Sequence, residues 1–295
     1  MRQIRIGTRG SKLAITQSQI VARRLRDAGH EVELVPIVTE GDSRPNDMSP
    51  GEGVFVAAIA RSLLDGSIDI GVHSAKDIPL EEEGDLVIAA YPERADSRDV
   101  LITRTGGQSL ETLAKGATVG TDSPRRTGFL RATRPDLRIL PLHGNVDTRL
   151  KRLDEGAVDA LVIAAAGVDR LGQSSRIDQR LDADLLAPAP GQGAIAIQAR
   201  RSDRDVLAML ADVDDADVRF AVEVEREVLK ATGGTCRAPV GALASADEGQ
   251  FTLLVAGVNS DGSSKHVERI RGRREDAIRL AREAGERLVA EVGLR

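Results

Sequence analysis

Two short sequence patterns that each occur twice constrain the fold of this chain more than any other feature. IGTRGSKLA at residues 6–14 resembles VGTDSPRRT at 119–127, and GSIDIGVHSA at 66–75 resembles GAVDALVIAA at 156–165. The patterns recur in the same order, at offsets of 113 and 90 residues. We interpret them as two copies of one α/β unit, roughly residues 1–93 and 98–187. Chance similarity between common strand and helix patterns is the alternative.

The first copy predicts alternating strands and helices. Strands are expected at 3–8, 31–37 and 68–73, and helices at 13–28 and 54–65. Gly29 is a suitable residue to end the first helix. This order favours a largely parallel sheet, and such sheets bind ligands at the carboxyl ends of their strands. We therefore expect a cleft between two such units.

The rest of the chain predicts a return to the first unit and then a smaller domain. LAPAPGQG at 186–193 suits a crossover, and 194–199 reads as one more strand. From 215 onward we expect a long helix, a loop with Cys236, two or three strands and a closing helix. The predicted fold class is α/β, with two similar periplasmic-binding-protein-like domains around a cleft and a C-terminal α+β domain. The domains are predicted at 1–93 with 194–213, at 94–193, and at 214–295.

Composition narrows the possible functions. A net charge of −5 and only five aromatic residues disfavour nucleic-acid binding. No apolar run is long enough to span a membrane. A single Cys permits no internal disulfide and no cysteine-based zinc cluster, and we expect no metal. The N-terminus does not resemble a signal peptide, so we expect a cytoplasmic protein.

Arginines recur where predicted strands pass into helices. In GTDSPRRTGFL, the capping candidates are Thr121, Asp122 and Ser123, and Arg125 and Arg126 fall in the first helical turn. Cations there are unfavourable unless an anion offsets them. The alternative is a pair of solvated surface arginines. Arg9, Arg149 and Arg170 occupy similar junctions. The pattern predicts a polyanionic ligand; since P-loop and dinucleotide motifs are absent, carboxylates fit best.

The segment VHSAKDIP places ionisable residues at the end of a buried strand. Asp77 is the candidate for acid/base work or for stabilising a cation. An ion pair between Lys76 and Asp77 is the alternative, and we expect His73 to be a buried, hydrogen-bonded residue. Cys236, in GGTCRAPVG, is either a buried apolar side chain or a thiol activated by Arg237.

Seven ordered segments resemble the porphobilinogen deaminase family and cover nearly the whole chain. They are RIGTRGSKLA, VELVPIVTEGD, VHSAKDIP, VGTDSPRRT, HGNVDTRL, LAPAPGQGA and GGTCRAPVGA. The resemblance implies a dipyrromethane cofactor bound covalently to Cys236 through a thioether. It also implies that four porphobilinogen molecules are joined head to tail with loss of ammonia, that Asp77 is the essential aspartate, and that the protein is a monomer.

The resemblance also assigns binding residues. The implied cofactor contacts are Ser74, Lys76, Thr121, Ser123, Arg125, Arg126, Asn145 and Arg149. The implied substrate contacts are Arg9, Ser11, His143, Arg149 and Arg170.

Three positions depart from the family pattern. His143 stands where many members have Arg, Asp122 replaces a usual Ser, and Glu52 lies in a loop that often carries lysines. Two other functions stay open: a non-catalytic, two-lobed protein that binds small anions, and a cysteine hydrolase that uses Cys236. No His residue lies in a recognisable partner motif for the hydrolase.

Overall fold

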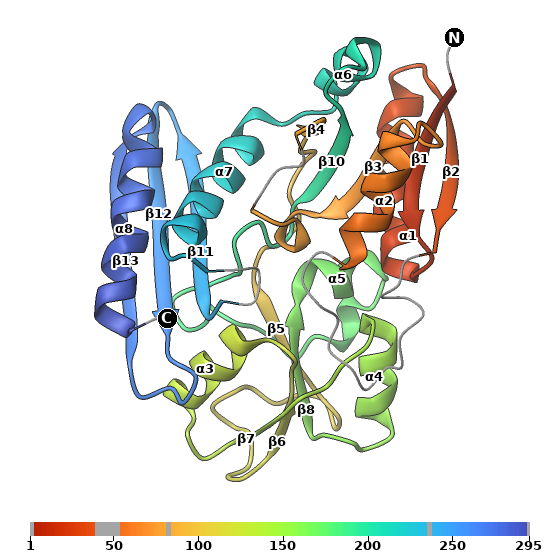
Figure 1. The fold of residues 1–295 in the computed structure, drawn as a ribbon. Coiled ribbons are helices and arrows are strands. Elements are labelled where there is room, and N and C mark those ends of the chain that lie inside the picture. Colours follow the sequence, from red (N-terminus) through yellow and green to blue (C-terminus); the bar gives the residue numbers. More distant parts are fainter. Residues whose placement is uncertain (1–2, 39–53, 81–83, 235–237, 294–295) are drawn as a thin grey trace. The chain divides into compact units, whose positions relative to one another are not determined.

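The computed structural model describes residues 3–38, 54–80, 84–234 and 238–293 of the 295-residue chain. These residues form two compact units (Figure 1). Unit 1 comprises Met1–Ala95 and Ala194–Arg219, and unit 2 comprises Asp96–Gly193 and Phe220–Arg295. The proposed separation of 214–295 as a third domain stays a prediction.

Unit 1 contains a five-stranded sheet in the order β2-β1-β3-β10-β4. Its strands are β1 (Gln3–Arg9), β2 (Glu31–Ile37), β3 (Ile70–Ser74), β4 (Leu86–Ala90) and β10 (Ile195–Arg200). Its helices are α1 (Lys12–Asp27), α2 (Val54–Leu64), the 3₁₀ turn η1 (Ala75–Asp77) and α6 (Arg204–Ala211); α7 (Ala216–Ala231) begins in unit 1 and continues into unit 2. The buried side of α1 recurs with helical spacing, and its residues Val21, Ala22 and Leu25 pack against the sheet.

Unit 2 contains a second five-stranded sheet, in the order β7-β6-β8-β5-β9. Its strands are β5 (Asp99–Thr103), β6 (Thr118–Gly120), β7 (Arg138–Leu140), β8 (Ala160–Ala164) and β9 (Gln179–Arg180). Its helices are α3 (Pro124–Thr133), α4 (Val146–Asp154), α5 (Ala165–Arg170) and the 3₁₀ turn η2 (Ser174–Arg176). The C-terminal part is an antiparallel meander of β11 (Val240–Asp247), β12 (Gln250–Val258) and β13 (Lys265–Arg273), followed by η3 (Arg274–Asp276) and α8 (Ala277–Val292).

The internal repeat is confirmed at the level of strand register. In unit 1, Ile6 of β1 pairs with Ile70 of β3, and in unit 2, Val119 of β6 pairs with Ala160 of β8. These pairs are related by the same offsets, 113 and 90 residues, that the sequence shows. The two sheets therefore correspond strand by strand, with β10 and β5 in equivalent places.

Each sheet is largely parallel, as predicted, but contains one antiparallel strand. Four strands of each sheet run in the same direction, whereas β10 runs antiparallel to its neighbours β3 and β4, and β5 runs antiparallel to its neighbours β8 and β9. The sequence repeat covers only the parallel part, so it carried no sign of the antiparallel strand. The predicted class, two similar α/β sheets with a smaller C-terminal α+β part, is confirmed.

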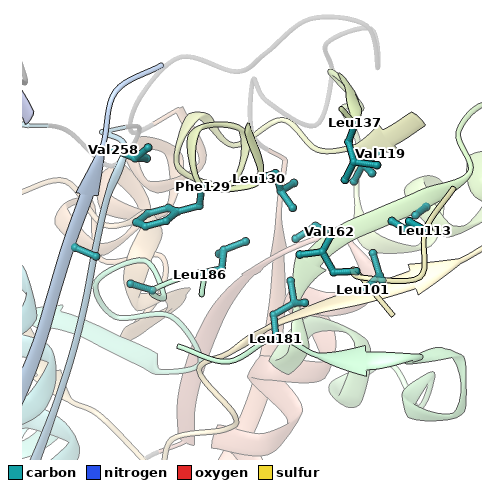
Figure 2. Packing of buried hydrophobic residues seen from close by; sticks show 14 of the residues in the cluster. Leu101, Leu113, Val119, Phe129, Leu130, Leu137, Val162, Leu181, Leu186 and Val258 are labelled. Carbon is teal, nitrogen blue, oxygen red and sulfur yellow. The ribbon is translucent and has the colours of Figure 1, made fainter. Parts of the chain in front are cut away.

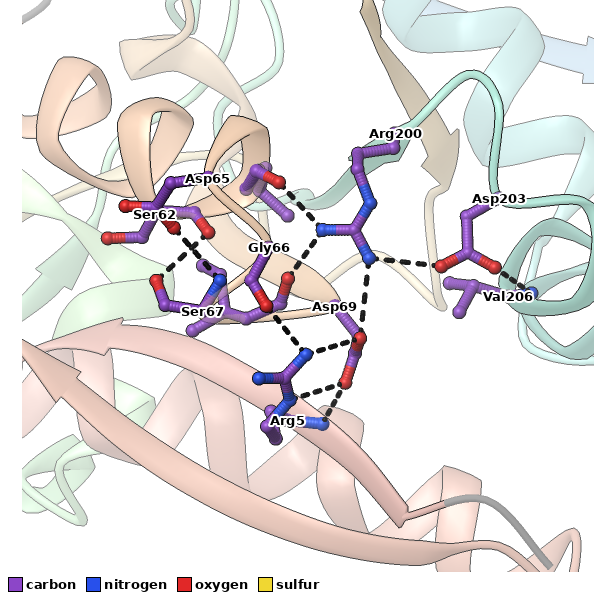
Figure 3. Close-up of polar contacts among 11 residues, drawn as sticks. Arg5, Ser62, Asp65, Gly66, Ser67, Asp69, Arg200, Asp203 and Val206 are labelled. Atoms are coloured by element: carbon purple, nitrogen blue, oxygen red, sulfur yellow. Dashed lines mark hydrogen bonds and ion pairs between the residues drawn. The ribbon is translucent and has the colours of Figure 1, made fainter.

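A buried carboxylate holds the first and third strands of unit 1 together (Figure 3). Asp69, which is 1% exposed, accepts hydrogen bonds from the backbone N–H of Arg5 at 2.9 Å and from its Nε at 3.0 Å. Arg200, at the end of β10, donates to the same carboxylate at 3.3 Å and pairs with Asp203 at 3.0 Å. Asp203 in turn caps α6 by accepting from Val206 N–H. One carboxylate thus joins β1, β3 and β10.

The repeat gives unit 2 a weaker version of this contact. Asp159, at the position equivalent to Asp69, accepts from the backbone N–H of Thr118 at 2.8 Å and from its hydroxyl at 2.7 Å. Its side chain is 48% exposed, and Arg104 lies 3.8 Å away. Water can therefore solvate this carboxylate.

One hydrophobic cluster runs through unit 2 from the second sheet to the C-terminal meander (Figure 2). Val119 and Val162 belong to the sheet, Phe129 and Leu130 to α3, and Val258 to β12. Because these side chains share one core, the C-terminal strands pack on the helix that begins with the two predicted site arginines.

His73 is buried in the sheet of unit 1, as its position on a strand predicted. It is 6% exposed, and its Nε2 lies 3.2 Å from Oε1 of Gln198 on β10. Burial lowers the pKa of His73 from 6.5 to about 4, although the hydrogen bond to Gln198 opposes this change. The imidazole ring is therefore neutral in the folded protein at neutral pH.

Replacing Asp69 should destabilise the protein more than replacing its counterpart in the repeat. We expect Asp69→Asn to lower the free energy of unfolding by about 3 kcal/mol, because it leaves buried donors without a charged acceptor. The matched control Asp159→Asn should cost about 1 kcal/mol, since water can replace part of the contact. Urea unfolding of both variants measures the difference, and equal losses would contradict the role given to Asp69.

His73 should make stability depend on pH. The unfolded chain binds a proton at this residue near its ordinary pKa, but the folded protein does so only near pH 4. Its contribution is therefore present above about pH 6.5 and is lost as the pH falls toward 4, by about 3 kcal/mol in total. Urea unfolding of wild type and His73→Gln between these pH values measures the contribution of His73 to the free energy of unfolding. If the free energies of the two proteins change with pH in parallel, His73 does not make this contribution.

Candidate functional site

In unit 1, predicted site residues lie at the carboxyl ends of two neighbouring parallel strands. Arg9 is the last residue of β1, and Ser11 caps α1 by accepting a hydrogen bond from Ala14 N–H at 3.3 Å. Ser74 is the last residue of β3, and η1 carries Lys76 and Asp77 directly after it. Because β1 and β3 are adjacent and parallel, these residues share one edge of the sheet.

The turn that carries Asp77 is anchored at its start. Ala75 is buried, and its N–H donates to the carbonyl of Ala194 at 3.0 Å. The turn closes with a bond from Ile78 N–H to the carbonyl of Ala75 at 3.3 Å, and Pro79 follows. Asp77 itself is exposed. A fixed backbone therefore presents an accessible carboxylate at the end of a buried strand.

Gln17 is a neighbour of this edge that the sequence did not reveal. It is buried on α1, and its Nε2 donates to Oγ of Ser74 at 2.9 Å. Because the serine oxygen accepts this bond, the hydroxyl proton of Ser74 remains able to donate to a ligand. The only sequence signal was a polar residue at a helix position that the apolar periodicity assigns to the core.

In unit 2, a second set of predicted residues follows β6. Ser123 caps α3 by accepting from Arg126 N–H at 3.4 Å, and Pro124 occupies the first helical position. Thr121 is buried, and its N–H donates to Leu140 of β7 at 3.0 Å. The helix start predicted from GTDSPRR is therefore confirmed, with Ser123 as the cap.

The two arginines of this helix are buried around one carboxylate. Arg125 and Arg126 are 3% and 5% exposed, which excludes the alternative of two solvated surface arginines. Nη2 of Arg125 donates to Asp99 at 2.7 Å, and Nε of Arg126 donates to the same carboxylate at 2.9 Å. Arg125 also donates to the carbonyl of Ala187. The anion expected to offset these cations is thus supplied, in part, by the protein itself.

Gln192 extends this network into the crossover segment. Its Nε2 donates to Asp99 at 3.0 Å and to the carbonyl of Ser97 at 2.7 Å, and its Oε1 accepts from Arg126 at 3.5 Å. Gly191 has a φ of +75°, a conformation that glycine adopts readily. The sequence analysis missed both Asp99 and Gln192. For Asp99, the available signal was a single acidic residue in the apolar strand DVLIT.

The remaining candidates of unit 2 lie near the ends of β7 and β8. His143 and Asn145 follow β7, and Arg149 on α4 donates its Nε–H to the carbonyl of Gly144 at 2.8 Å. Arg170 ends α5, directly after β8, and donates to the carbonyl of Gly193 at 2.8 Å. Burial lowers the pKa of Arg170 to about 10, so it is still a cation at neutral pH.

Some predicted features cannot be placed. Cys236 and Glu52 lie outside the described residues, as does Arg237. Within the described ranges, no group of three or more His, Cys, Asp or Glu residues is arranged to hold a metal ion. None of the helices in the described part of the chain is long and apolar enough to cross a membrane.

Two family models match almost the whole sequence. Residues 4–208 match "porphobilinogen deaminase, dipyromethane cofactor binding domain", and residues 219–290 match "porphobilinogen deaminase, C-terminal domain". A solved structure of a methionine-binding protein, MetQ, resembles the fold with a TM-score of 0.47 at 15% identity, over 74% of this chain and 92% of that one.

Curated relatives agree with the family models over similar lengths. A porphobilinogen deaminase of Acidothermus cellulolyticus is 43% identical, covering 98% of this chain and 88% of the relative. One from an Exiguobacterium species is 41% identical, covering 99% and 97%. One from a Roseiflexus species is 47% identical, covering 84% and 83%. The chain therefore belongs to the porphobilinogen deaminase family.

Proposed function

We propose that this chain is a hydroxymethylbilane synthase, a transferase of porphyrin and haem biosynthesis. It removes ammonia from four porphobilinogen molecules, joins them head to tail on a covalent dipyrromethane cofactor, and releases the linear tetrapyrrole. The observation that carries this proposal is the family match, which extends through both the cofactor-binding and the C-terminal parts of the chain. We further propose that the enzyme is a cytoplasmic monomer that binds neither nucleic acid nor membranes.

The residues around Asp99 fit a cofactor that carries carboxylates. Two buried guanidinium groups share this single carboxylate, so the cluster keeps an excess positive charge. The described bonds of Arg126 use Nε and Nη2, which leaves Nη1 able to bind a further anion. A ligand carboxylate would offset the charge by accepting a charge-assisted hydrogen bond from this nitrogen.

Arg170 supports the same conclusion from another position. Its guanidinium is largely buried, and its described hydrogen bond goes to a neutral carbonyl, that of Gly193. A cation held in this way gains most from an anionic ligand, because a carbonyl compensates only part of the lost hydration. We assign Arg170, with Arg9, Ser11, His143 and Arg149, to the substrate carboxylates.

Cys236 is the proposed attachment point of the cofactor, and Ser74, Lys76, Thr121, Ser123, Arg125, Arg126, Asn145 and Arg149 are its proposed contacts. When bound, the cofactor supplies a pyrrole ring whose free α-carbon is the nucleophile. The hydroxyl groups of Ser74 and Ser123 each accept a hydrogen bond from the protein, so each can donate its own proton to a carboxylate. Both hydroxyl groups are therefore suited to donate to the carboxylates of the cofactor.

Asp77 is the proposed catalytic residue. Loss of ammonia from porphobilinogen leaves a cationic methylene-pyrrolenine, and an ionised carboxylate beside the pyrrole N–H stabilises that charge. The anchored turn holds the carboxylate in place before the charge develops, which reduces the reorganisation required during the reaction. After carbon–carbon bond formation, the same group can receive the proton that the ring releases.

The intact mass of the purified protein tests this function. Wild type should carry the mass of a covalent dipyrromethane and convert porphobilinogen, with a colour reaction to Ehrlich's reagent. Cys236→Ser should have the mass of the bare polypeptide and no turnover. An unmodified, folded wild-type protein without turnover would instead support a non-catalytic protein that binds small anions.

Asp77→Asn should separate catalysis from cofactor attachment. The substitution keeps the shape of the side chain but removes its charge, so we expect the adduct to remain while kcat falls by about a hundredfold or more. Asp85→Asn, at another exposed aspartate of unit 1, is the matched control and should retain kcat. Normal turnover of Asp77→Asn would remove Asp77 from its assigned role.

A further inference from the structure

Two side chains on neighbouring loops of unit 2 approach each other directly. Asp122 follows β6 and His143 lies beyond the end of β7, and these strands are adjacent and parallel. Nδ1 of His143 lies 2.9 Å from Oδ1 of Asp122. The side chains are 19% and 18% exposed, so the pair is shielded but still accessible to a ligand.

The approach of Asp122 restricts what the imidazole ring can do. Nδ1 is buried and forms no regular hydrogen bond in the described part of the chain, where Asp122 is its ion-pair partner. An ionised carboxylate can accept a proton but cannot donate one. The 2.9 Å contact is therefore favourable when Nδ1 carries a proton.

This leaves Nε2 as the ring nitrogen for a ligand. With a proton on Nδ1, Nε2 is an acceptor in the neutral ring and a donor in the doubly protonated ring. A carboxylate ligand requires a donor, so it selects the doubly protonated ring. That form has two N–H groups, and each needs an acceptor.

The arginines at the starts of α3 and α4 form their described contacts with groups other than His143. At the start of α3, Arg125 and Arg126 bond to Asp99. At the start of α4, Arg149 donates to the carbonyl of Gly144. Among the described ion pairs, the contact of His143 is with Asp122. In the described ion pairs, Asp122 is therefore the acidic group that lies against this ring.

We propose that Asp122 is a positioning residue that holds His143 as a two-donor imidazolium. One N–H bonds to Asp122, and the other bonds to a carboxylate of the substrate. The inference rests on the proposed function, because it takes porphobilinogen as the ligand. It assigns Asp122 a role in substrate binding that acts through His143 rather than by direct contact with the substrate.

A double-mutant cycle tests this coupling. Asp122→Asn should raise the KM for porphobilinogen by about tenfold, the effect of losing a charge-assisted hydrogen bond, with kcat changed by about twofold at most. In a His143→Gln background, the same substitution should change KM by less than about twofold, because an amide donor needs no second acceptor. Asp154→Asn, at an exposed ion pair with Arg176, is the matched control and should leave KM unchanged.

Long-range ¹H–¹⁵N spectra of the histidine rings give a readout that needs no turnover. The signals of His143 are those that disappear in His143→Gln. We expect Asp122→Asn to shift the Nδ1 resonance of His143 and to leave the other three histidines unchanged. Asp122→Ser serves as a second variant if thermal unfolding shows that Asp122→Asn does not fold.

Each outcome decides the inference. A KM effect that is lost in the His143→Gln background supports it, whereas an equal effect in both backgrounds, or no effect in either, overturns it. If wild type loads no cofactor and turns over no porphobilinogen, the proposed function fails separately. In that case the spectra test the contact between Asp122 and His143 by themselves. An unshifted Nδ1 resonance in Asp122→Asn contradicts the contact, and a shifted resonance supports it.

Discussion

In each unit, the arrangement of the predicted site residues depends on one aspartate that lies directly before a strand, Asp69 before β3 and Asp159 before β8. Asp69 and Asp159 each bond to the backbone of the first strand in their own sheet, and so fix the register between the two strands. This register determines which residues reach the carboxyl edge. In unit 1 it aligns the end of β1 with η1 and Asp77, and in unit 2 it aligns the helix start at Ser123 with α5 and Arg170.

Asp99 solves a different physical problem. Two guanidinium groups at the start of a helix oppose its dipole, and their burial removes hydration from both. One carboxylate between them compensates part of this cost but leaves the cluster cationic. A protein that needed only stability would favour an apolar cluster of similar volume at this place. The retained charge is therefore consistent with selection for binding an anion.

Local patterns in the sequence predicted much of the fold and part of the site. The recurrence of GTRGS and GTDSP located both helix starts and predicted two copies of one α/β unit, and the strand pairs of the two sheets correspond at the same offsets. The antiparallel strands β10 and β5 were not predicted as such, because their direction depends on contacts distant in sequence. Asp99, Gln17 and Gln192 were missed for the same reason: each acts through a partner that only the folded chain brings near.

The position of β10 has a consequence for how the protein is made. This strand lies between β3 and β4, yet more than a hundred residues separate it from them in sequence. During synthesis on the ribosome, the first sheet therefore lacks the strand between β3 and β4 until β10 has been translated. In the second sheet the equivalent strand, β5, is translated before its neighbours, so this sheet can form without such a delay. The nascent N-terminal part exposes unpaired strand edges during this interval, which makes it a candidate client for chaperones.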